Sequence, residues 1–185
     1  PAESNVSAWA QGLSSAVVGV VLLFTFGVRL IGVSGVSMQD TLYTGDRLMV
    51  LNSMFCDYQP GDVVVVNAYN AQLDETLVKR IVAVEGQTVD IDFNTGTVYV
   101  DGQALDEPYA KEPTYTTDGT EFPLTLKENE VFIMGDNRNH STDSRSYRLG
   151  PVDEGYIQGK AIFLLIPGRT AETGRLDFSR LGPIN

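Results

Sequence analysis

Apolar positions dominate the start of the chain. Between Glu3 and Arg29 lie 25 residues without a charge, and the centre of this stretch reads AVVGVVLLFTFGV. A helix needs about 20 such residues to cross a bilayer. Trp9 stands near one end, where an interfacial aromatic residue is favoured. The pattern predicts an N-terminal segment, residues 1–31, with a transmembrane helix over about residues 8–28.

Two other interpretations of this stretch are weaker. A cleaved signal peptide begins with basic residues and has a shorter apolar core, whereas no basic residue precedes Arg29. A buried helix of a globular domain rarely runs so long without a charge. The sequence begins at Pro1 without a methionine, so we expect the natural start, with its orienting charges, to lie upstream.

After this segment the pattern changes to short strands. Runs rich in β-branched and apolar residues predict buried strands at residues 62–69, 76–84, 131–134 and 160–166. VDIDF at 89–93 alternates cleanly, Asn94-Thr95-Gly96 predicts a hairpin loop, and TVYV follows as the return strand. Residues 107–129, rich in Pro, Thr, Gly and acids, predict an exposed excursion. Together these features predict a mostly β domain, a barrel or a sandwich.

Composition excludes several classes of function. The net charge is −11, from 24 acidic and 13 basic residues. This argues against a nucleic-acid surface and against docking on anionic lipid through a basic patch. One cysteine, Cys56, and one histidine, His140, cannot form an intrachain disulfide or a Cys/His zinc site. We interpret them as a packing residue and a loop residue, and expect no metal or cofactor.

A Gly/Ser segment directly after the apolar run contains candidate nucleophiles. It reads VSGVSMQDTL, residues 33–42, and includes Ser34 and Ser37. A serine nucleophile needs a base, because its hydroxyl is protonated at neutral pH. His140, the usual residue type, lies in a polar loop. A lysine can serve instead where burial lowers its pKa.

Lys79 is the candidate base, because it alone of the four lysines lies inside an apolar strand pattern, residues 76–84. The sequence leaves one alternative open, that Lys79 snorkels from an edge strand. The other lysines lie in polar stretches or before a strand: Lys111, Lys127 and Lys160.

A dense polar cluster, GDNRNHSTDSR at residues 135–145, follows the apolar run VFIM directly. Its charged side chains can pair with one another or with Arg80, and these are Asp136, Arg138, Asp143 and Arg145. Ser141 or Ser144 can hydrogen-bond a neutral lysine. A purely structural turn is the alternative interpretation.

These three segments, in this order after an apolar span, resemble the bacterial type I signal peptidases of the single-span, Gram-positive-like form. The motifs are SGVSMQDTL, VKRIVAVEG and GDNRNHSTDSR, and the resemblance extends to about Phe163. It implies a membrane-bound serine endopeptidase that removes signal peptides from exported preproteins. Cleavage would follow small P3 and P1 residues, Ala-x-Ala-like, through a Ser-Lys dyad and an acyl-enzyme.

The resemblance also assigns roles to single residues. Ser37 would be the nucleophile, Lys79 the general base, and Ser141 the residue that orients Lys79. The backbone N–H of Ser37 would donate to the oxyanion, while Gly35 has no hydroxyl to add, so the second donor stays open. Met38 would line the substrate pocket. Ion-pairing residues would support the site: Arg80, Asp136, Asp143 and Arg145.

For the whole chain, the resemblance implies one transmembrane helix followed by a signal-peptidase-like β-barrel or sandwich, residues 32–185. A small inserted β region, residues 86–129, would be the variable part. The enzyme would lie in the cell membrane as a single-pass protein, with its catalytic domain on the extracytoplasmic side. Its partners would be signal peptides and the bilayer, not nucleic acid, and we expect a monomer.

Asp40 is the clearest departure from the family, which usually has Pro in SMxPTL. An aspartate can bond nearby backbone N–H groups instead. If it lay close to Lys79 it would raise the lysine pKa. We therefore expect Asp40→Pro to keep or improve activity at neutral pH. Ser34 would be structural.

Two rival functions remain at this point. The self-cleaving SOS repressors use Ser-Lys chemistry on a related β fold, but they predict a DNA-binding N-terminal domain and no span. A membrane-anchored β binding module with a decayed active site is the rival of a different class, and Gly35 and Asp40 leave it open.

Overall fold

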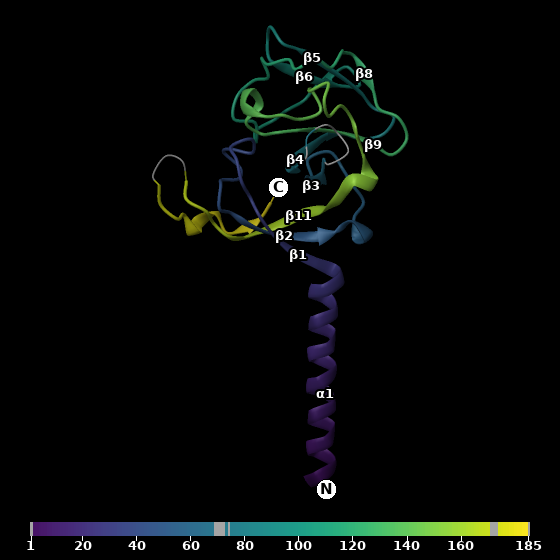
Figure 1. Ribbon diagram of the computed structural model, residues 1–185, viewed down its shortest axis with the longest axis vertical. Helices are drawn as coiled ribbons and strands as arrows, with labels where there is room; N and C mark the ends of the chain where they lie inside the picture. Colours follow the sequence, from purple (N-terminus) through teal and green to yellow (C-terminus); the bar gives the residue numbers. More distant parts are fainter. Residues whose placement is uncertain (1, 69–72, 74, 171–173, 185) are drawn as a thin grey trace.

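The computed structural model describes residues 2–68, 73, 75–170 and 174–184. Helix α1 (Ala2–Leu22) continues through one π-helical turn (Leu23–Gly27) and projects from a β domain as a stalk (Figure 1). Of the described residues, Trp9–Gly27 form a helix that is long and apolar enough to cross a membrane. The mostly β fold with one N-terminal apolar helix is confirmed.

The main sheet is antiparallel and eight-stranded, in the order β1-β2-β11-β3-β4-β9-β10, with β12 beside β11. Its strands are β1 (Val28–Gly32), β2 (Arg47–Asn52), β3 (Val63–Asn67), β4 (Thr76–Ala83), β9 (Glu130–Met134), β10 (Val152–Asp153), β11 (Ile157–Ile166) and β12 (Gly182–Pro183). Short 3-10 helices join them: η2 (Ser53–Phe55), η3 (Arg138–His140), η4 (Glu154–Tyr156) and η5 (Phe178–Arg180).

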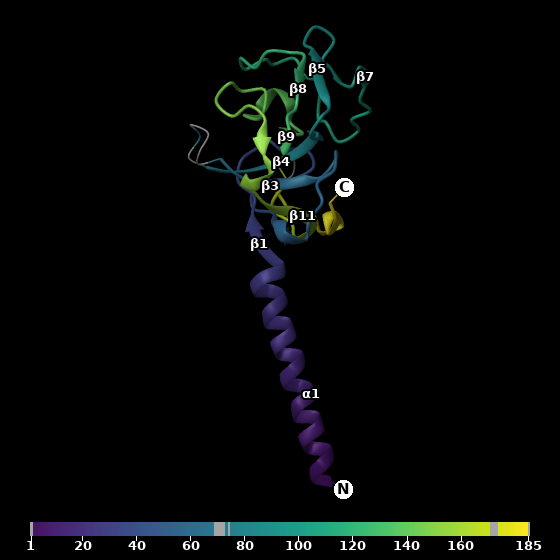
Figure 2. The same cartoon turned by 90° about the vertical axis from the view of Figure 1, so that its right-hand side faces the viewer.

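A second, smaller sheet has the order β7-β6-β5-β8 and lies at the end of the domain farthest from α1 (Figures 1 and 2). Its strands are β5 (Thr88–Asp92), β6 (Thr97–Val100), β7 (Gln103–Ala104) and β8 (Leu124–Thr125). Asp92 pairs with Thr97 across the predicted hairpin, and the Asp92 carboxylate accepts a bond from Asn94 N at 2.9 Å. Gly96 supplies the positive φ, 76°, that this turn requires.

The sequence patterns missed the first two strands of the main sheet. Residue 28 was placed in the span, but β1 begins there and pairs with β2 in register, Val28 opposite Leu51. β1 is a partly exposed edge strand, so its residues show no clean alternation of buried and exposed positions. Only its long-range pairing with β2 distinguishes it from the end of the apolar helix.

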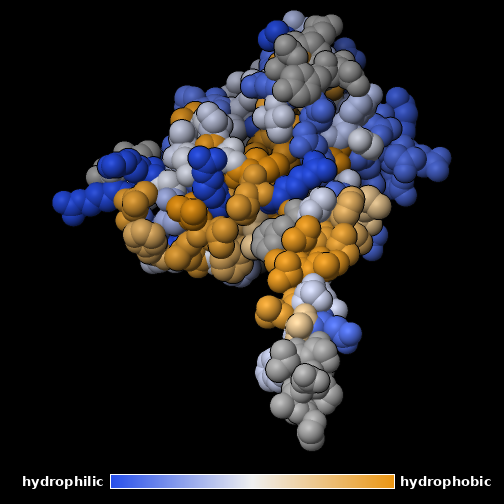
Figure 3. All heavy atoms as spheres, turned by 60° about the horizontal axis from the view of Figure 1, so that its bottom comes forward, coloured by the Kyte–Doolittle hydropathy of each residue, from blue (hydrophilic) through white to orange (hydrophobic). Residues whose placement is uncertain are grey.

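Apolar side chains gather on the face of the domain from which α1 leaves (Figure 3). Exposed large apolar residues of β1, η2 and the end of β11 contribute to it: Leu30, Met54, Phe55, Leu165 and Ile166. An exposed patch of this kind marks an interaction surface for protein or membrane.

Candidate active site

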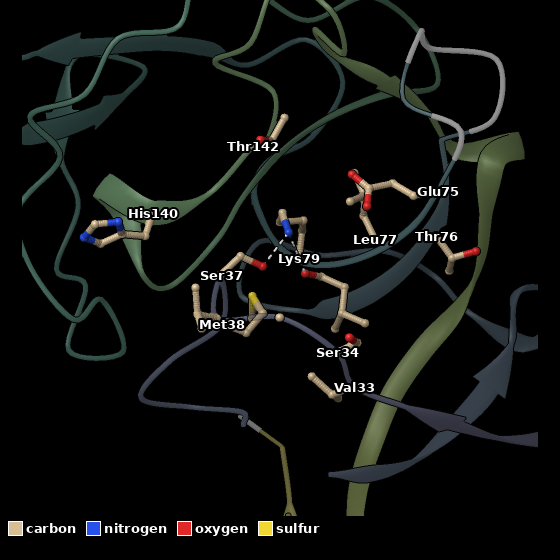
Figure 4. Close-up of a pocket in the computed structure, with 13 residues that line it drawn as sticks. Val33, Ser34, Ser37, Met38, Glu75, Thr76, Leu77, Lys79, His140 and Thr142 are labelled. Atoms are coloured by element: carbon tan, nitrogen blue, oxygen red, sulfur yellow. Dashed lines mark hydrogen bonds between the residues drawn. The ribbon is translucent and has the colours of Figure 1, made fainter. Parts of the chain in front are cut away.

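Ser37 and Lys79 meet in a cavity of about 220 Å³ between the loop after β1 and the beginning of β4 (Figure 4). The Lys79 Nζ donates to the Ser37 Oγ at 2.7 Å and to the Val78 carbonyl at 3.1 Å. The two partners lie 42 residues apart in the sequence. The 2.7 Å between the Lys79 Nζ and the Ser37 Oγ is within the range of a nucleophile hydrogen-bonded to its base.

Strand β4 pairs with β3 at Lys79 and with β9 from Arg80 onward, and the Lys79 side chain is only 3% exposed. The alternative that Lys79 snorkels from an edge strand is therefore wrong. Burial lowers the lysine pKa from its ordinary value to about 8, and the Arg145 cation adds to this effect. Carboxylates of Asp143, Glu75 and Asp136 oppose it. The neutral form of the Lys79 amine is therefore much more populated near neutral pH than that of an ordinary lysine.

The loop that carries Ser37 is fastened to the core by two apolar residues. Met38 and Leu42 are 2% and 1% exposed and pack with residues of β2, β3 and β11. Backbone bonds from Gln39 N to Val36 O, 3.1 Å, and from Leu42 N to Met38 O, 2.7 Å, close the turn between them. Met38 also lines the cavity, and its role in binding substrate stays a prediction. Ser34 lies exposed in the cavity wall.

A C-terminal arginine holds the same loop from its other side. Arg180 pairs with the buried Asp46 at 2.6 Å and donates to the Thr41 carbonyl at 3.1 Å. Its guanidinium carbon lies 4.4 Å from the centre of the Tyr43 ring, a cation–π contact. The sequence contains no local signal for these contacts, because residues 41 and 180 are 139 positions apart.

The supporting ion pairs form between the predicted residues, with one exception. Arg80 holds Asp136 through two bonds of 2.9 and 2.8 Å, and both side chains are buried. Asp143 and Arg145 pair at 2.8 Å. Arg138 instead pairs outside the cluster, with Glu107 at 2.7 Å. The sequence missed Glu107 because it lies in the irregular excursion, where nothing marks one acid among many.

Gly135 brings the polar cluster into contact with the nucleophile. Its N–H donates to Asp143 Oδ2 at 2.9 Å. A side-chain carbon built at Gly135 would overlap Ser141 and lie 2.5 Å from the Ser37 carbonyl oxygen. Only glycine fits at this position. Its place in the motif was visible in the sequence, but the reason for a glycine was not.

The Ser141 hydroxyl lies beside Gly135 but makes no hydrogen bond with any described residue. In particular, it does not bond Lys79, whose bonds go to Ser37 and Val78. The orienting role of Ser141 therefore stays a prediction. Its buried hydroxyl nevertheless needs a partner, because an unpaired buried donor is costly.

Gly35 is not free to donate to an oxyanion, since its N–H bonds Thr44 Oγ1 at 3.1 Å. The Thr44 hydroxyl returns a bond to the Gly35 carbonyl at 2.8 Å. Gly35 has a φ of +98°, a conformation that favours glycine. Its role in this structure is to shape the turn before the nucleophile.

The contacts of Asp40 lie outside the Ser37–Lys79 pair. Its carboxylate is 56% exposed and pairs with Lys111 at 3.2 Å. It is not among the charges that shift the Lys79 pKa, which belong to Asp143, Glu75, Asp136 and Arg145. The condition under which Asp40 would raise the Lys79 pKa, a position close to the amine, is therefore not met in this structure.

Neither Cys56 nor His140 takes part in the Ser37–Lys79 contact. The Cys56 thiol bonds the Asn52 carbonyl at 3.3 Å, beside η2. His140 is exposed at the mouth of the cavity, at the end of η3 (Figure 4). These placements agree with a packing residue and a loop residue.

Comparison with known proteins gives the family. Residues 6–166 match the family model described as "Signal peptidase, peptidase S26". A "Signal peptidase I" of Bacillus amyloliquefaciens is 33% identical over 174 residues, which cover 89% of this chain and 90% of that protein. A "Probable signal peptidase I-1" of Synechocystis is 37% identical over 152 residues, 77% of this chain and 74% of the relative.

A solved signal peptidase I from Enterococcus faecalis is 26% identical and aligns with a TM-score of 0.47, over 57% of this chain and 97% of that one. The family model alone spans most of the sequence, including all three motifs. On that ground the chain belongs to the signal peptidase family, peptidase S26, and is a serine peptidase.

Proposed function

We propose that this protein is a membrane-anchored endopeptidase that removes N-terminal signal peptides from exported preproteins with a Ser37–Lys79 dyad. The 2.7 Å bond between Ser37 Oγ and a buried lysine carries the proposal. Family membership supports the substrate class. The test is cleavage of a preprotein by the purified, detergent-solubilised protein, with the new N-terminus read by mass spectrometry.

In the proposed reaction, the neutral Lys79 amine takes the proton of Ser37 as Oγ attacks the scissile carbonyl. The Ser37 N–H stabilises the oxyanion. Lysine then gives its proton to the leaving amine, and the signal peptide stays bound to Ser37 as an ester. A water molecule, deprotonated by Lys79, hydrolyses this ester and restores both side chains.

We infer that the substrate binds as an extended strand beside β4. Residues 76–79 pair with β3 on one edge, whereas β9 covers the other edge only from Arg80 onward. In the described part of the chain, the second edge of 76–79 therefore faces the cavity without a strand partner. An extended peptide can complete such an edge. Its P1 and P3 side chains would enter the small cavity, which suits Ala-x-Ala-like sequences.

We place the catalytic domain, residues 32–185, at the extracytoplasmic surface of the cell membrane, as a single-pass monomer that meets its substrate at the bilayer. Residues 1–31 would anchor it, and residues 86–129, which contain the second sheet, would be the variable insert. Ser37 follows the end of β1 by five residues. The exposed apolar face around α1 supports this placement (Figure 3).

The pH profile should follow the titration of Lys79. Its folded pKa of about 8 lies below the ordinary 10.5, and only the neutral amine accepts a proton. We expect kcat/KM to rise about tenfold per pH unit below 8 and to level off above it. Glu75→Gln should move the midpoint to lower pH, because the Glu75 carboxylate raises the lysine pKa. A flat profile between about pH 6 and 9 would contradict Lys79 as the base.

Asp40→Pro is expected to keep or improve activity at pH 7. The change removes an exposed pair with Lys111, and such pairs contribute about 0–1 kcal/mol. Because Asp40 does not shift the Lys79 pKa, the midpoint of the kcat/KM profile should stay in place. Lys111→Ala is the matched control for the lost pair. A large loss of activity in a folded Asp40→Pro protein would show that Asp40 has a role that this pair does not explain.

A further inference from the structure

We propose that Asn137 is a positioning residue that sets the oxyanion hole by holding the two peptide units on either side of Ser37. The inference rests on the proposed dyad function and extends it to the second oxyanion donor. Asn137 lies between Asp136 and Arg138 in the polar cluster, 3% exposed, and does not line the cavity.

Asn137 binds two consecutive carbonyls of the nucleophile loop. Its side-chain Nδ2 donates to Val36 O at 3.1 Å, and its backbone N donates to Ser37 O at 2.9 Å. Val36 O also accepts from Gln39 N at 3.1 Å, so both of its lone pairs are used. The peptide units before and after Ser37 are thus each fixed by a bond from the same residue.

Fixing these carbonyls also fixes the N–H groups of the same peptide units. In a trans peptide the C=O and the N–H lie in one plane and point in opposite directions. The bond to Val36 O therefore turns the Ser37 N–H away from Asn137, and the bond to Ser37 O does the same for the Met38 N–H. Neither N–H donates to another described group. Ser37 and Met38 both line the cavity, so the Met38 N–H becomes the second donor that Gly35 cannot be.

The unused end of the Asn137 amide supports a donor role. Its Oδ1 is buried and accepts no bond from any described residue. The reverse orientation of the amide would place this oxygen against Val36 O, which is repulsive. An asparagine that only filled space would not need to leave a buried acceptor unpaired at a cost in stability. The NH₂ group is what the loop uses.

The backbone segment that carries Asn137 is held firmly by the contacts of its neighbour Asp136. The neighbouring Asp136 carboxylate is held by Arg80 through two bonds and by the Thr41 hydroxyl at 2.5 Å. Its backbone carbonyl accepts from Lys111 N at 2.9 Å. Preorganised donors stabilise an oxyanion because they need no reorientation during the reaction.

The test compares Asn137→Ala with Asn139→Ala. Asn139 is the matched control, because it lies two residues further on and bonds Tyr115 N at 2.9 Å and Pro113 O at 3.1 Å, not the nucleophile loop. With a peptide spanning a signal-peptide cleavage site, we expect Asn137→Ala to lose about 10- to 100-fold in kcat, approaching the loss of a whole donor, with KM unchanged. The inhibition constant of the matching peptide aldehyde, whose adduct carries an oxyanion, should rise by a similar factor.

A merely structural role gives a different result. Such a role would lower kcat without raising the inhibition constant of the aldehyde, or it would move the midpoint of the pH profile that Lys79 sets. Either outcome overturns the inference. Activity within about twofold of Asn139→Ala also overturns it, since a lost donor costs far more. Absence of cleavage by the wild-type protein would instead remove the proposed function and this inference together.

Asn137→Asp provides an independent readout if the alanine variant does not fold. A carboxyl group can donate to Val36 O only when it is protonated, and burial favours the protonated form. The activity of the variant relative to wild type should therefore rise as the pH is lowered from about 8 to 6. A ratio that is constant over this range would overturn the donor role.

Discussion

Replacement of Lys79 by methionine is expected to lower kcat by about 10⁴- to 10⁶-fold, the range found when a nucleophile or its base is removed from other serine proteases. Without the amine, nothing within hydrogen-bond distance of Ser37 Oγ accepts its proton among the described residues. The fold should survive, because Lys79 is 3% exposed and methionine replaces a buried amine with an apolar side chain of similar length. Cleavage of a preprotein in detergent measures the effect.

Lys160→Met is the matched control. Lys160 lies on β11, pairs with Asp62 at 2.5 Å, is 32% exposed and does not line the cavity that holds Ser37 and Lys79. The Lys160→Met variant should retain wild-type activity. Ser37→Ala should be as inactive as Lys79→Met, because the two residues act as a unit. Cleavage that persists in both would show that another residue is the nucleophile. A wild-type protein that binds signal peptides without cutting them would favour the binding module with a decayed site.

Gly135→Ala is expected to reduce kcat by about 10²-fold or more, since a displacement of about 1 Å in a catalytic group has effects of this size. The added methyl would overlap Ser141 and press on the Ser37 carbonyl oxygen, 2.5 Å away. Backbone and buried side chains are close-packed here, so the loop has to shift. The 2.7 Å bond between Ser37 and Lys79 would lengthen. Steady-state kinetics with the peptide substrate measures the loss.

Gly32→Ala separates this effect from a general loss of glycine. At Gly32 an added methyl meets only the guanidinium end of Arg47, which is flexible and can move away. We expect near-wild-type kcat for Gly32→Ala and a Tm within a few degrees of wild type for both variants. If Gly135→Ala keeps its activity, the close contact with Ser37 does not position the nucleophile. If Gly135→Ala loses activity and its Tm falls as well, the close contact between Gly135 and Ser37 contributes to stability and not to the position of the nucleophile.

The strands of the catalytic domain could be predicted where burial leaves a local pattern. The β-branched run of β3, the alternation of β5 and the turn at Gly96 all predicted elements that the structure contains. β1 and β2 could not be predicted, because β1 continues the apolar segment of the helix and is defined only by its pairing. β7 and β8 have two residues each, too few for a periodic pattern, and β8 also lies within the exposed excursion.

The sequence selected Ser37 and Lys79, which the structure brings within hydrogen-bond distance, and two ion pairs beside them, but it missed the other contacts of the site. The motif order and the apolar surroundings of Lys79 were enough to select Ser37 and Lys79. The partner of Arg138, the direction of Asp40 and the bonds of Asn137 depend on which loops meet in space. Glu107 and Arg138 are 31 residues apart, and Asn137 and Val36 are 101 residues apart. No local pattern carries information over such distances.

By itself, the sequence determined that an apolar helix precedes a β domain, that three motifs follow in the family order, and that one lysine lies in an apolar strand. These properties follow from composition and short-range periodicity, which the chain carries locally. The tertiary structure decided how far Lys79 is buried, which side chains pair, and which residues line the cavity. Those properties depend on the strand order β3-β4-β9 and on the loops packed against it, because burial and hydrogen bonding arise only when distant segments meet.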